Sequence, residues 1–172
     1  MRIREATGAD AASAAALWTE AYAAQGAGEG RTAPYAEGDL AASAAAATVL
    51  VAESERGEVI GIVALLPPGS GPAAVARAGE AELSRLAVAA RARGRGIGRE
   101  LAVRCLGLAR EQGAAAVALW SRPYQVAAHS LYESLGFRRA PERDGRDPDG
   151  RRWAFALELG EPTSGAAYTL LR

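Results

Sequence analysis

Apolar residues alternate with polar ones in some segments of this chain and recur every three or four positions in others. These two periods predict a mixture of strands and helices. Residues Glu82–Val88 predict a strand that carries Leu86 and Val88 on one face. The segment Gly96–Gln112 predicts a helix, because apolar residues recur there at helical spacing. The expected buried stripe of this helix consists of Ile97, Leu101, Cys105 and Leu108.

The other segments complete an order of strand, helix, helix, three strands, helix, strand, helix and two strands. Strands are expected over residues 3–7, 48–53, 59–66, 117–120, 137–140 and 152–159. Helices are expected over residues 11–24, 37–47 and 131–135. Thr7 or Asp10 is suited to cap the first helix. Residues 25–34 are rich in glycine and irregular, and the polar turn 141–150 joins the last two strands.

The connection between strand 82–88 and the helix that follows is basic and rich in glycine. Arg91, Arg93 and Arg95 alternate there with small residues, so side chains shield little of the backbone. Unpaired N–H groups at a helix N-terminus and the positive end of the helix dipole attract phosphate groups. The connection therefore predicts a site for a phosphate-bearing ligand. A tight connection that binds nothing has the same composition and is the alternative.

Two common phosphate-binding motifs do not match this connection. The dinucleotide fingerprint needs glycines at its first, third and sixth positions, and although Gly94 and Gly96 fill the first two, Arg99 stands at the sixth. A P-loop needs lysine followed by serine or threonine, and this chain contains no lysine. A nucleotide site of the kinase or dehydrogenase type is therefore disfavoured.

A different pattern is present in two places. After Leu86–Val88 the chain reads Arg-Gly-Arg-Gly-Ile-Gly at Arg93–Gly98, which is an Arg-x-x-Gly-x-Gly sequence. Further along, Leu131–Phe137 reads Leu-Tyr-Glu-Ser-Leu-Gly-Phe, with Gly136 placed to end a helix. In this order and at this separation, the two motifs resemble the GCN5-related N-acetyltransferases (GNAT). The clear match extends from about Ala81 to Phe137.

The resemblance implies an α/β fold with a mixed central sheet of about seven strands and about four helices. We expect one domain over residues 1–160, followed by a tail over residues 161–172. In this family the fourth and fifth strands splay apart at a bulge in the fourth. Acetyl-CoA inserts into the gap, where its pantetheine arm pairs with the strand edge as an extra strand would. The expected co-substrate is therefore acetyl-CoA, and no metal is expected.

Carried onto this chain, the resemblance implies two groups of cofactor-binding residues. Leu86, Ala87 and Val88 would offer main-chain groups to the pantetheine arm. Gln125 stands seven residues before Tyr132, where the family often has asparagine, so its amide would reach the same arm. The residues that would hold the pyrophosphate are Arg93, Gly94, Arg95, Gly96, Ile97, Gly98 and Arg99.

The implied reaction is direct attack of an amine on acetyl-CoA, which needs a proton acceptor, donors for an oxyanion and an acid for the leaving thiolate. Glu82, six residues before Val88, stands where the histone-modifying branch places its catalytic glutamate. A polar strand-start residue, with a water relay as base, is the alternative. The Val88 N–H is the expected oxyanion donor. Tyr132 is expected to supply a proton to the thiolate, because a phenol, with a pKa of about 10, is protonated at neutral pH; a packing role is the alternative.

Two further reactive groups are expected to take no part in catalysis. Cys105 lies on the apolar stripe of a helix, where a thiol more often packs than reacts. His129, the only histidine, lies one turn before Tyr132. A lone histidine on a helix is more often a surface residue, and a role in the cofactor cleft is the alternative.

The acceptor site is expected to form from the first two helices, the loop between them and the final hairpin turn. These segments carry aromatic and acidic side chains, which suit an amine through cation–π contacts and charge. They are Trp18, Tyr22, Tyr35, Glu29, Glu37 and the acidic turn from Asp144 to Asp149. We expect the acceptor to be a small-molecule primary amine. A protein N-terminus or lysine side chain is one alternative, and a non-catalytic acyl-CoA sensor is another.

Composition narrows the class of partner. The chain has 172 residues and a formal net charge of zero, which gives no electrostatic attraction to nucleic acid or to an anionic membrane. Its apolar runs are too short to span a bilayer, and its N-terminus lacks the apolar core of a signal peptide. A single cysteine excludes an internal disulfide. These features favour the cytoplasm, and the absence of lysine indicates the coding bias of a GC-rich bacterium. The edge strands of the expected fold are compatible with a homodimer.

Overall fold

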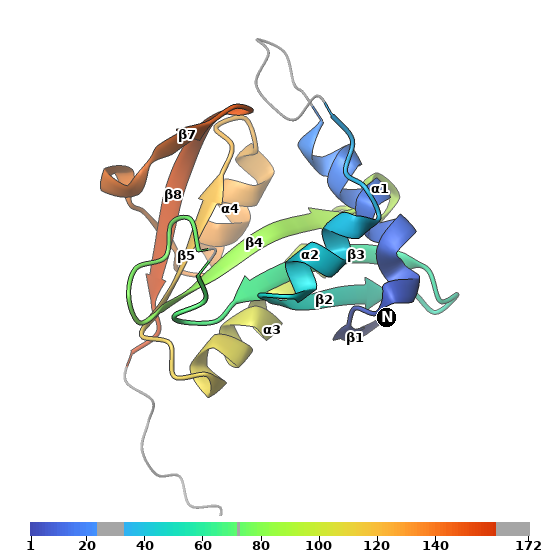
Figure 1. Cartoon of the computed structure of the whole chain (residues 1–172), viewed down its shortest axis with the longest axis horizontal. Helices are drawn as coiled ribbons and strands as arrows, with labels where there is room; N and C mark the ends of the chain where they lie inside the picture. Colours follow the sequence, from blue (N-terminus) through green and yellow to red (C-terminus); the bar gives the residue numbers. More distant parts are fainter. Residues whose placement is uncertain (24–32, 72, 161–172) are drawn as a thin grey trace, which may run out of the picture.

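The computed structural model describes residues 1–23, 33–71 and 73–160, and within them the elements follow the expected order (Figure 1). The helices are α1 Ala11–Tyr22, α2 Gly38–Ala44, α3 Ile97–Glu111 and α4 Val126–Ser134. The strands are β1 Arg2–Glu5, β2 Thr48–Glu53, β3 Val59–Leu66, β4 Glu80–Val88, β5 Ala116–Ser121, β6 Arg138–Arg139, β7 Gly145–Asp147 and β8 Gly150–Glu158. Most of the loop predicted at 25–34 and the tail at 161–172 lie outside the described residues.

A single mixed sheet forms the centre of the molecule. Its strand order is β1-β2-β3-β4-β5-β8-β6, and β7 pairs with the start of β8. The only parallel neighbours among the described strands are β4 and β5. Their pairing covers only Glu80–Glu82 against Ala116–Ala118, after which the two strands diverge (Figure 1). The predicted mixed α/β fold and the splay between the fourth and fifth strands are confirmed.

A bulge in β4 accompanies this splay. Ile62 of β3 pairs with Ala87 of β4, whereas Ala64 pairs with Ser84, so β4 has one residue more than β3 over this stretch. Arg85 lies within it and has a φ of 55°. Residues with a Cβ rarely adopt this left-handed backbone conformation, because it is strained. An extra residue bends a strand, which turns the end of β4 away from β5.

Helix α1 holds the bulged backbone with two side-chain hydrogen bonds. The indole Nε1 of Trp18 donates to the carbonyl oxygen of Arg85 at 2.9 Å. The hydroxyl of Tyr22 donates to the carbonyl oxygen of Leu86 at 3.2 Å. These bonds supply donors to two backbone carbonyl groups of β4 at the bulge, and they tie this part of the strand to α1.

The helices cover both faces of the sheet, with α1 and α2 over one face and α3 against the other (Figure 1). Gly61 of β3 lies so close to α3 that a Cβ there would be 2.9 Å from Ile97 Cγ2 and 3.0 Å from Leu101 Cδ1. The predicted stripe of α3 is confirmed, because Ile97, Leu101 and Cys105 are buried and Leu108 packs partly buried against the core. No helix in the described part of the chain is long and apolar enough to cross a membrane.

The structure corrects several predicted boundaries, among them that of α4, which begins at Val126 instead of Leu131 and ends at Ser134. The fourth strand starts at Glu80, whose carboxylate binds Arg143 at 2.6 Å. Helix α2 ends at Ala44, and turns follow it up to β2. The polar turn 141–150 contains a 3-10 turn and β7, so the described sheet has eight strands instead of seven. Ion pairs between distant residues stabilise this hairpin, and a local hydrophobic pattern does not register them.

Candidate active site

Two cavities meet where β4 and β5 diverge. The larger, of about 610 Å³, lies among the bulged part of β4, the loop before α3, and α4. The smaller, of about 370 Å³, lies among α1, α2, the middle of the sheet and the β7–β8 hairpin. The residues that line both cavities are Tyr22, Ser84, Arg85, Trp120 and Gln125. A ligand in one cavity can therefore meet a ligand in the other at the splay.

The larger cavity, which we call the cofactor cavity, brings together nearly all the predicted cofactor residues. Its lining includes Leu86, Ala87, Val88, Arg93, Gly94, Gly96, Ile97, Gly98, Arg99, Gln125 and Tyr132. Arg95 is exposed and does not line it. The pairing of β4 with β5 ends at Glu82, so the β4 edge on that side offers main-chain groups to whatever fills the cavity.

The loop before α3 has the geometry of an anion site. Gly94 and Gly96 have φ values of 74° and 79°, and a Cβ built at either position would meet open space. The first hydrogen bond of α3 runs from Glu100 N to Gly96 O at 3.0 Å. The N–H groups of residues 97–99 therefore have no acceptor within the helix, and they lie at the positive end of its dipole. Such a terminus binds phosphate or pyrophosphate.

Two arginines of this loop keep their charge at the surface beside the cavity. Arg93 donates from Nε to the carbonyl oxygen of Val88 at 3.2 Å, and its Nη2 lies 3.5 Å from a carboxylate oxygen of Glu20. Arg99 donates from Nη1 to the hydroxyl of Ser134 at 3.0 Å. Both side chains are exposed, so they can approach the phosphates of a bound ligand without first being dehydrated.

Tyr132 of α4 is buried and lines the cofactor cavity. Its ring packs against Phe137 and Phe155, with centroid distances of 5.8 and 6.0 Å. Burial raises the pKa of Tyr132 well above the ordinary value of 10, because the phenolate would be poorly solvated. The hydroxyl therefore keeps its proton at neutral pH, where it can serve as a hydrogen-bond or proton donor.

Gln125 occupies the N-cap position of α4 and lines both cavities. Its Oε1 accepts hydrogen bonds from the hydroxyl of Ser121 at 3.1 Å and from Arg122 N at 2.9 Å. The amide oxygen thus holds the turn between β5 and α4, which leaves the side-chain NH₂ group for a ligand. The sequence alone did not indicate this structural role.

His129 is buried, contrary to the expectation of a surface residue. Its Nε2 lies 3.0 Å from the carbonyl oxygen of Arg122, and its ring lies 5.4 Å from that of Trp153 and 5.1 Å from that of Phe155. Burial lowers the pKa of His129. The side chain lines neither cavity and supports the β5–α4 turn instead. The position of His129 on a helix does not reveal that Trp153 and Phe155 of β8 cover this face of the helix.

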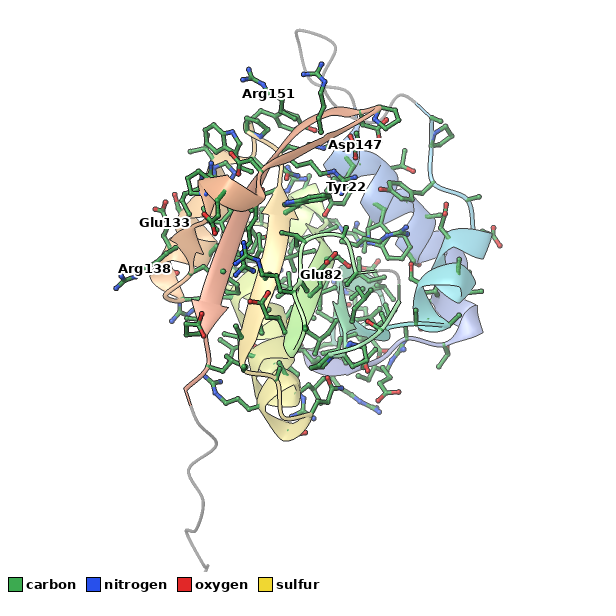
Figure 2. All side chains as sticks on the ribbon, turned by 60° about the vertical axis from the view of Figure 1, so that its left-hand side comes forward. Tyr22, Glu82, Glu133, Arg138, Asp147 and Arg151 are labelled. Atoms are coloured by element: carbon green, nitrogen blue, oxygen red, sulfur yellow. The ribbon has the colours of Figure 1, made fainter. Side chains whose placement is uncertain are left out.

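Glu82 lies in the smaller cavity, which we call the acceptor cavity. The residue is buried, and its Oε2 accepts hydrogen bonds from the N–H groups of Ala74, Val75 and Ala76 at 2.7, 2.8 and 3.2 Å. The carboxylate therefore anchors the loop between β3 and β4. Figure 2 labels Glu82 and Tyr22 of α1, which both line this cavity, and Asp147 of β7, whose carboxylate binds the lining residues Arg122 and Arg152.

The predicted aromatic residues divide between the cavity and the core. Tyr22 and Tyr35 line the acceptor cavity. Trp18 is fully buried beneath them and lines neither cavity, because its indole is directed to the β4 backbone. Glu37 is exposed and lies outside both cavities, and Glu29 lies outside the described residues.

The predicted acidic turn does not present free carboxylates. Asp144 pairs with Arg139 at 2.8 Å, and Asp147 binds Arg122 at 2.9 Å and also binds Arg152. Burial alone would raise the pKa of Asp147, but the hydrogen bonds from the two arginines outweigh it and lower that pKa. These acids are thus occupied by arginines and do not wait for a substrate ammonium group.

Arginine is the residue type that the sequence analysis missed in the acceptor cavity. Arg85, Arg122 and Arg152 all line it. Arg85 interrupts a largely apolar strand, and Arg122 directly follows the buried strand β5. A charged residue at such a position is a signal of function, because it must be paired or must serve a ligand.

Comparison with known proteins agrees with this geometry. The model of the Acetyltransferase (GNAT) family matches residues 14–137. The chain belongs to the GNAT acetyltransferase family. It is 42% identical over 92 residues, 51% of its length, to N-acetylaspartate synthetase of Rattus norvegicus, of which the match covers 27%. It is 40% identical over 89 residues, 52% of its length, to N-acetyltransferase family 8 member 2 of the same organism, of which the match covers 38%. The chain therefore spans well under half the length of these relatives.

Solved structures of this family share the GNAT fold over nearly their whole length. Ribosomal-protein-alanine N-acetyltransferase from Brucella melitensis aligns with a TM-score of 0.71 and 24% identity, covering 92% of this chain and 99% of that one. A phosphinothricin acetyltransferase from Sinorhizobium meliloti in complex with AcCoA aligns with a TM-score of 0.72 and 21% identity, covering 95% and 91%. At these identities the likeness shows the fold alone.

Proposed function

We propose that this GNAT protein transfers the acetyl group of acetyl-CoA to the primary amine of a small molecule. The observation that carries the proposal is the junction of the two cavities at the β4–β5 splay. One cavity combines an anion-binding helix terminus with an open strand edge, and the other reaches the same point through five shared residues. A phosphate-bearing donor and an acceptor can therefore meet without a covalent enzyme intermediate.

In this proposal the cofactor cavity receives acetyl-CoA from the side of α3. The N–H groups at residues 97–99 bind the pyrophosphate, with Arg93 and Arg99 adding positive charge. Leu86 and Val88 hold the pantetheine arm through main-chain groups of the open strand edge, as an added strand would be held. The thioester then lies near the splay, where the two cavities meet.

The chemistry assigns one task to each residue near the junction. The amine nitrogen attacks the thioester carbonyl carbon, so that the N–C bond forms and the C–S bond breaks. Glu82 accepts the proton released by the amine, directly or through water, and its Oε1 is available for this because the loop amides bind Oε2. The Val88 N–H donates to the oxyanion, and Tyr132 donates its phenolic proton to the leaving thiolate.

Two observations favour a small-molecule acceptor over a protein. The acceptor cavity, at about 370 Å³, lies in the range of small-molecule sites. The relative named N-acetylaspartate synthetase, by its name, makes a small acetylated molecule. The Brucella structure named for a ribosomal protein supports the alternative, but its likeness shows the fold alone.

The test combines binding with turnover. Thermal unfolding is measured with acetyl-CoA, NAD and ATP, and acetyl-CoA at about a hundred times its Kd should add about 2.7 kcal/mol of stability. Release of CoA is then followed with a panel of small amines and with peptides. Stabilisation by acetyl-CoA together with CoA release in the presence of small amines supports the proposal. Stabilisation without release in any arm supports an acyl-CoA sensor, and absence of stabilisation contradicts the cofactor assignment.

A further inference from the structure

Arg85 is a cation in the acceptor cavity without an anionic partner. Among residues 1–23, 33–71 and 73–160, no carboxylate forms an ion pair with it. Its Nη1 is buried and has no hydrogen-bond partner. A guanidinium presents five donors, and a buried donor that stays unpaired is unfavourable. The described part of the chain therefore supplies no acceptor for the Nη1 donor of Arg85.

Arg122 and Arg152, the other arginines of the cavity, differ from Arg85 in having anionic partners, although Arg152 Nε is also a buried donor without a partner among the described residues. Arg122 binds both carboxylate oxygens of Asp147, at 2.9 and 3.0 Å, and lies 3.7 Å from Asp149. Arg152 also binds Asp147. Carboxylates of the β7–β8 hairpin neutralise these two cations, whereas no carboxylate of the described residues pairs with Arg85.

The surroundings of Arg85 hold its guanidinium in a defined place. Its Cζ lies 5.0 Å from the ring centroid of Trp18 and 5.3 Å from that of Tyr35. Its carbonyl oxygen accepts the Trp18 indole hydrogen bond, which fixes the bulged backbone. Stacking engages the faces of a guanidinium and leaves its planar N–H edge for a ligand. The residue with the strained backbone, at a φ of 55°, is thus the one that presents a cation to the acceptor cavity.

Arg85 lies close to the place where the acceptor amine is proposed to react. The residue lines both cavities and follows Ser84 at the bulge, two positions before the proposed cofactor-binding Ala87. An anionic group bound there would belong to the acceptor and would lie close to the point where the cavities meet. The predicted acidic recognition of the acceptor is replaced by basic recognition, since the carboxylates of the hairpin are already paired.

We infer that the acceptor is a small amine that carries its own carboxylate, and that Arg85 binds this carboxylate. The inference rests on the proposed acetyltransferase function. A guanidinium edge matches a carboxylate with two parallel hydrogen bonds, which makes the recognition both ionic and geometric. Arg85 is therefore the residue that selects amino acids and related amino carboxylates over uncharged amines.

The experiment compares each amino carboxylate with its own carboxamide. Free amino acids and ω-amino acids are assayed for CoA release beside the matching carboxamides, with kcat/KM corrected for the fraction of neutral amine. The carboxylates should be preferred by at least about tenfold. In Arg85→Gln the kcat/KM for carboxylates should fall by about a hundredfold, whereas that for the carboxamides should stay within about twofold.

Two controls separate recognition from folding. Arg56→Gln removes an exposed arginine of the β2–β3 turn, outside both cavities, and should change neither substrate class. Thermal stabilisation of Arg85→Gln by acetyl-CoA should match that of the wild type, which shows that the cofactor cavity is intact. A third readout needs no turnover: the amino carboxylates should stabilise the CoA-bound wild type against heat, and this shift should vanish in Arg85→Gln.

The outcomes distinguish this inference from the proposed function. If amines are acetylated but carboxylates and carboxamides are used equally, or if Arg85→Gln affects both equally, the carboxylate assignment is wrong and the acetyltransferase stands. If no amino carboxylate stabilises the CoA-bound protein, the assignment is also wrong. Failure of acetyl-CoA itself to bind would instead remove the proposed function.

Discussion

The cofactor cavity and the acceptor cavity share five lining residues but are built from different parts of the chain. The cofactor cavity takes much of its lining from one continuous stretch, Leu83–Arg99, together with α4. Its binding groups are mostly main-chain N–H groups and the ends of regular elements. The acceptor cavity takes side chains from α1, α2, β3, β4, β5 and the β7–β8 hairpin.

This difference explains why the cofactor cavity can be predicted from the sequence more fully than the acceptor cavity. A helix N-terminus that follows a glycine loop binds phosphate through its backbone, so a short motif carries the information. The acceptor cavity depends on which side chains pair with one another across the sheet. Asp147 looked like a ligand for an amine, yet it is bound by Arg122 and Arg152. Only the pairing decides which charges are matched, and within residues 1–23, 33–71 and 73–160 no carboxylate pairs with Arg85.

The largest predicted effect tests the backbone-built cavity. Gly96→Glu should abolish acetyl-CoA binding, a loss of at least about a thousandfold or about 4 kcal/mol. The substitution places a negative side chain at the N-cap of α3, where the pyrophosphate is proposed to bind. Gly57→Glu is the matched control, since Gly57 has a φ of 78°, near the 79° of Gly96, but lies in the β2–β3 turn. Calorimetric titration with acetyl-CoA measures both, and unchanged affinity in folded Gly96→Glu contradicts the loop assignment.

The next effect tests the junction of the two cavities. Tyr132→Phe should slow turnover by about tenfold to a thousandfold and leave acetyl-CoA affinity within about twofold. Phenylalanine preserves the packing against Phe137 and Phe155 and removes only the acidic proton. Because burial raises the pKa of Tyr132, the wild type should lose no activity through deprotonation of this group as the pH rises to 10. Steady-state rates across this pH range check both points, and an unchanged rate would assign Tyr132 to packing.

A smaller effect separates the acceptor cavity from the cofactor cavity. Asp147→Asn should raise the acceptor KM by about threefold to tenfold, because it weakens the charged hydrogen bonds to Arg122 and Arg152. The affinity for acetyl-CoA should not change. Asp144→Asn is the control, since its partner Arg139 lines neither cavity, whereas the partners of Asp147 line the acceptor cavity. Equal effects of the two variants would assign the change to general loosening of the hairpin.

The ion pairs of Asp147 with Arg122 and Arg152 make the stability of the folded protein depend on pH. The pKa of Asp147 is lowered below the ordinary 3.8 in the folded protein. Its contribution to stability is therefore fully present well above pH 3.8 and is lost as the pH falls through the lower, folded-state pKa. Thermal unfolding of the wild type and Asp147→Asn should consequently converge only in acid below about pH 4. A difference that disappears nearer pH 6 would contradict the ion-pair assignment.

The smallest effect concerns a group that lies in neither cavity. Cys105→Ala should leave turnover within about twofold and lower the melting temperature by a few degrees, because it removes a packed side chain from α3. Burial raises the pKa of the Cys105 thiol to about 12, so the folded protein should resist alkylation at neutral pH. Mass spectrometry after iodoacetamide treatment checks this, and loss of turnover in the variant would argue for a covalent mechanism.

The local hydrophobic pattern predicts the presence of several helices and strands, but it does not predict where each of them begins and ends. The helical stripe of Ile97, Leu101 and Cys105 predicts both the existence of α3 and its buried face, since the period of a helix is a local property. The eighth strand, β7, was missed because its three residues carry no apolar side chain, and because the pairing of Asp147 with Arg122 of a distant segment is not visible in a local pattern. The burial of His129 was missed because its cover, Trp153 and Phe155 on β8, lies more than twenty residues away in sequence.

The sequence by itself determined the order of the elements, the glycine-rich loop proposed to bind phosphate and the resemblance to the GNAT family, because each of these depends on a short stretch of chain. Tertiary structure alone decided which charges of the acceptor cavity are paired and which is free. Ion pairing and burial depend on distances between residues far apart in sequence, and no local spacing encodes them. The bulge that turns β4 from β5 places Arg85 between the two cavities, and that placement exists only once the sheet has formed.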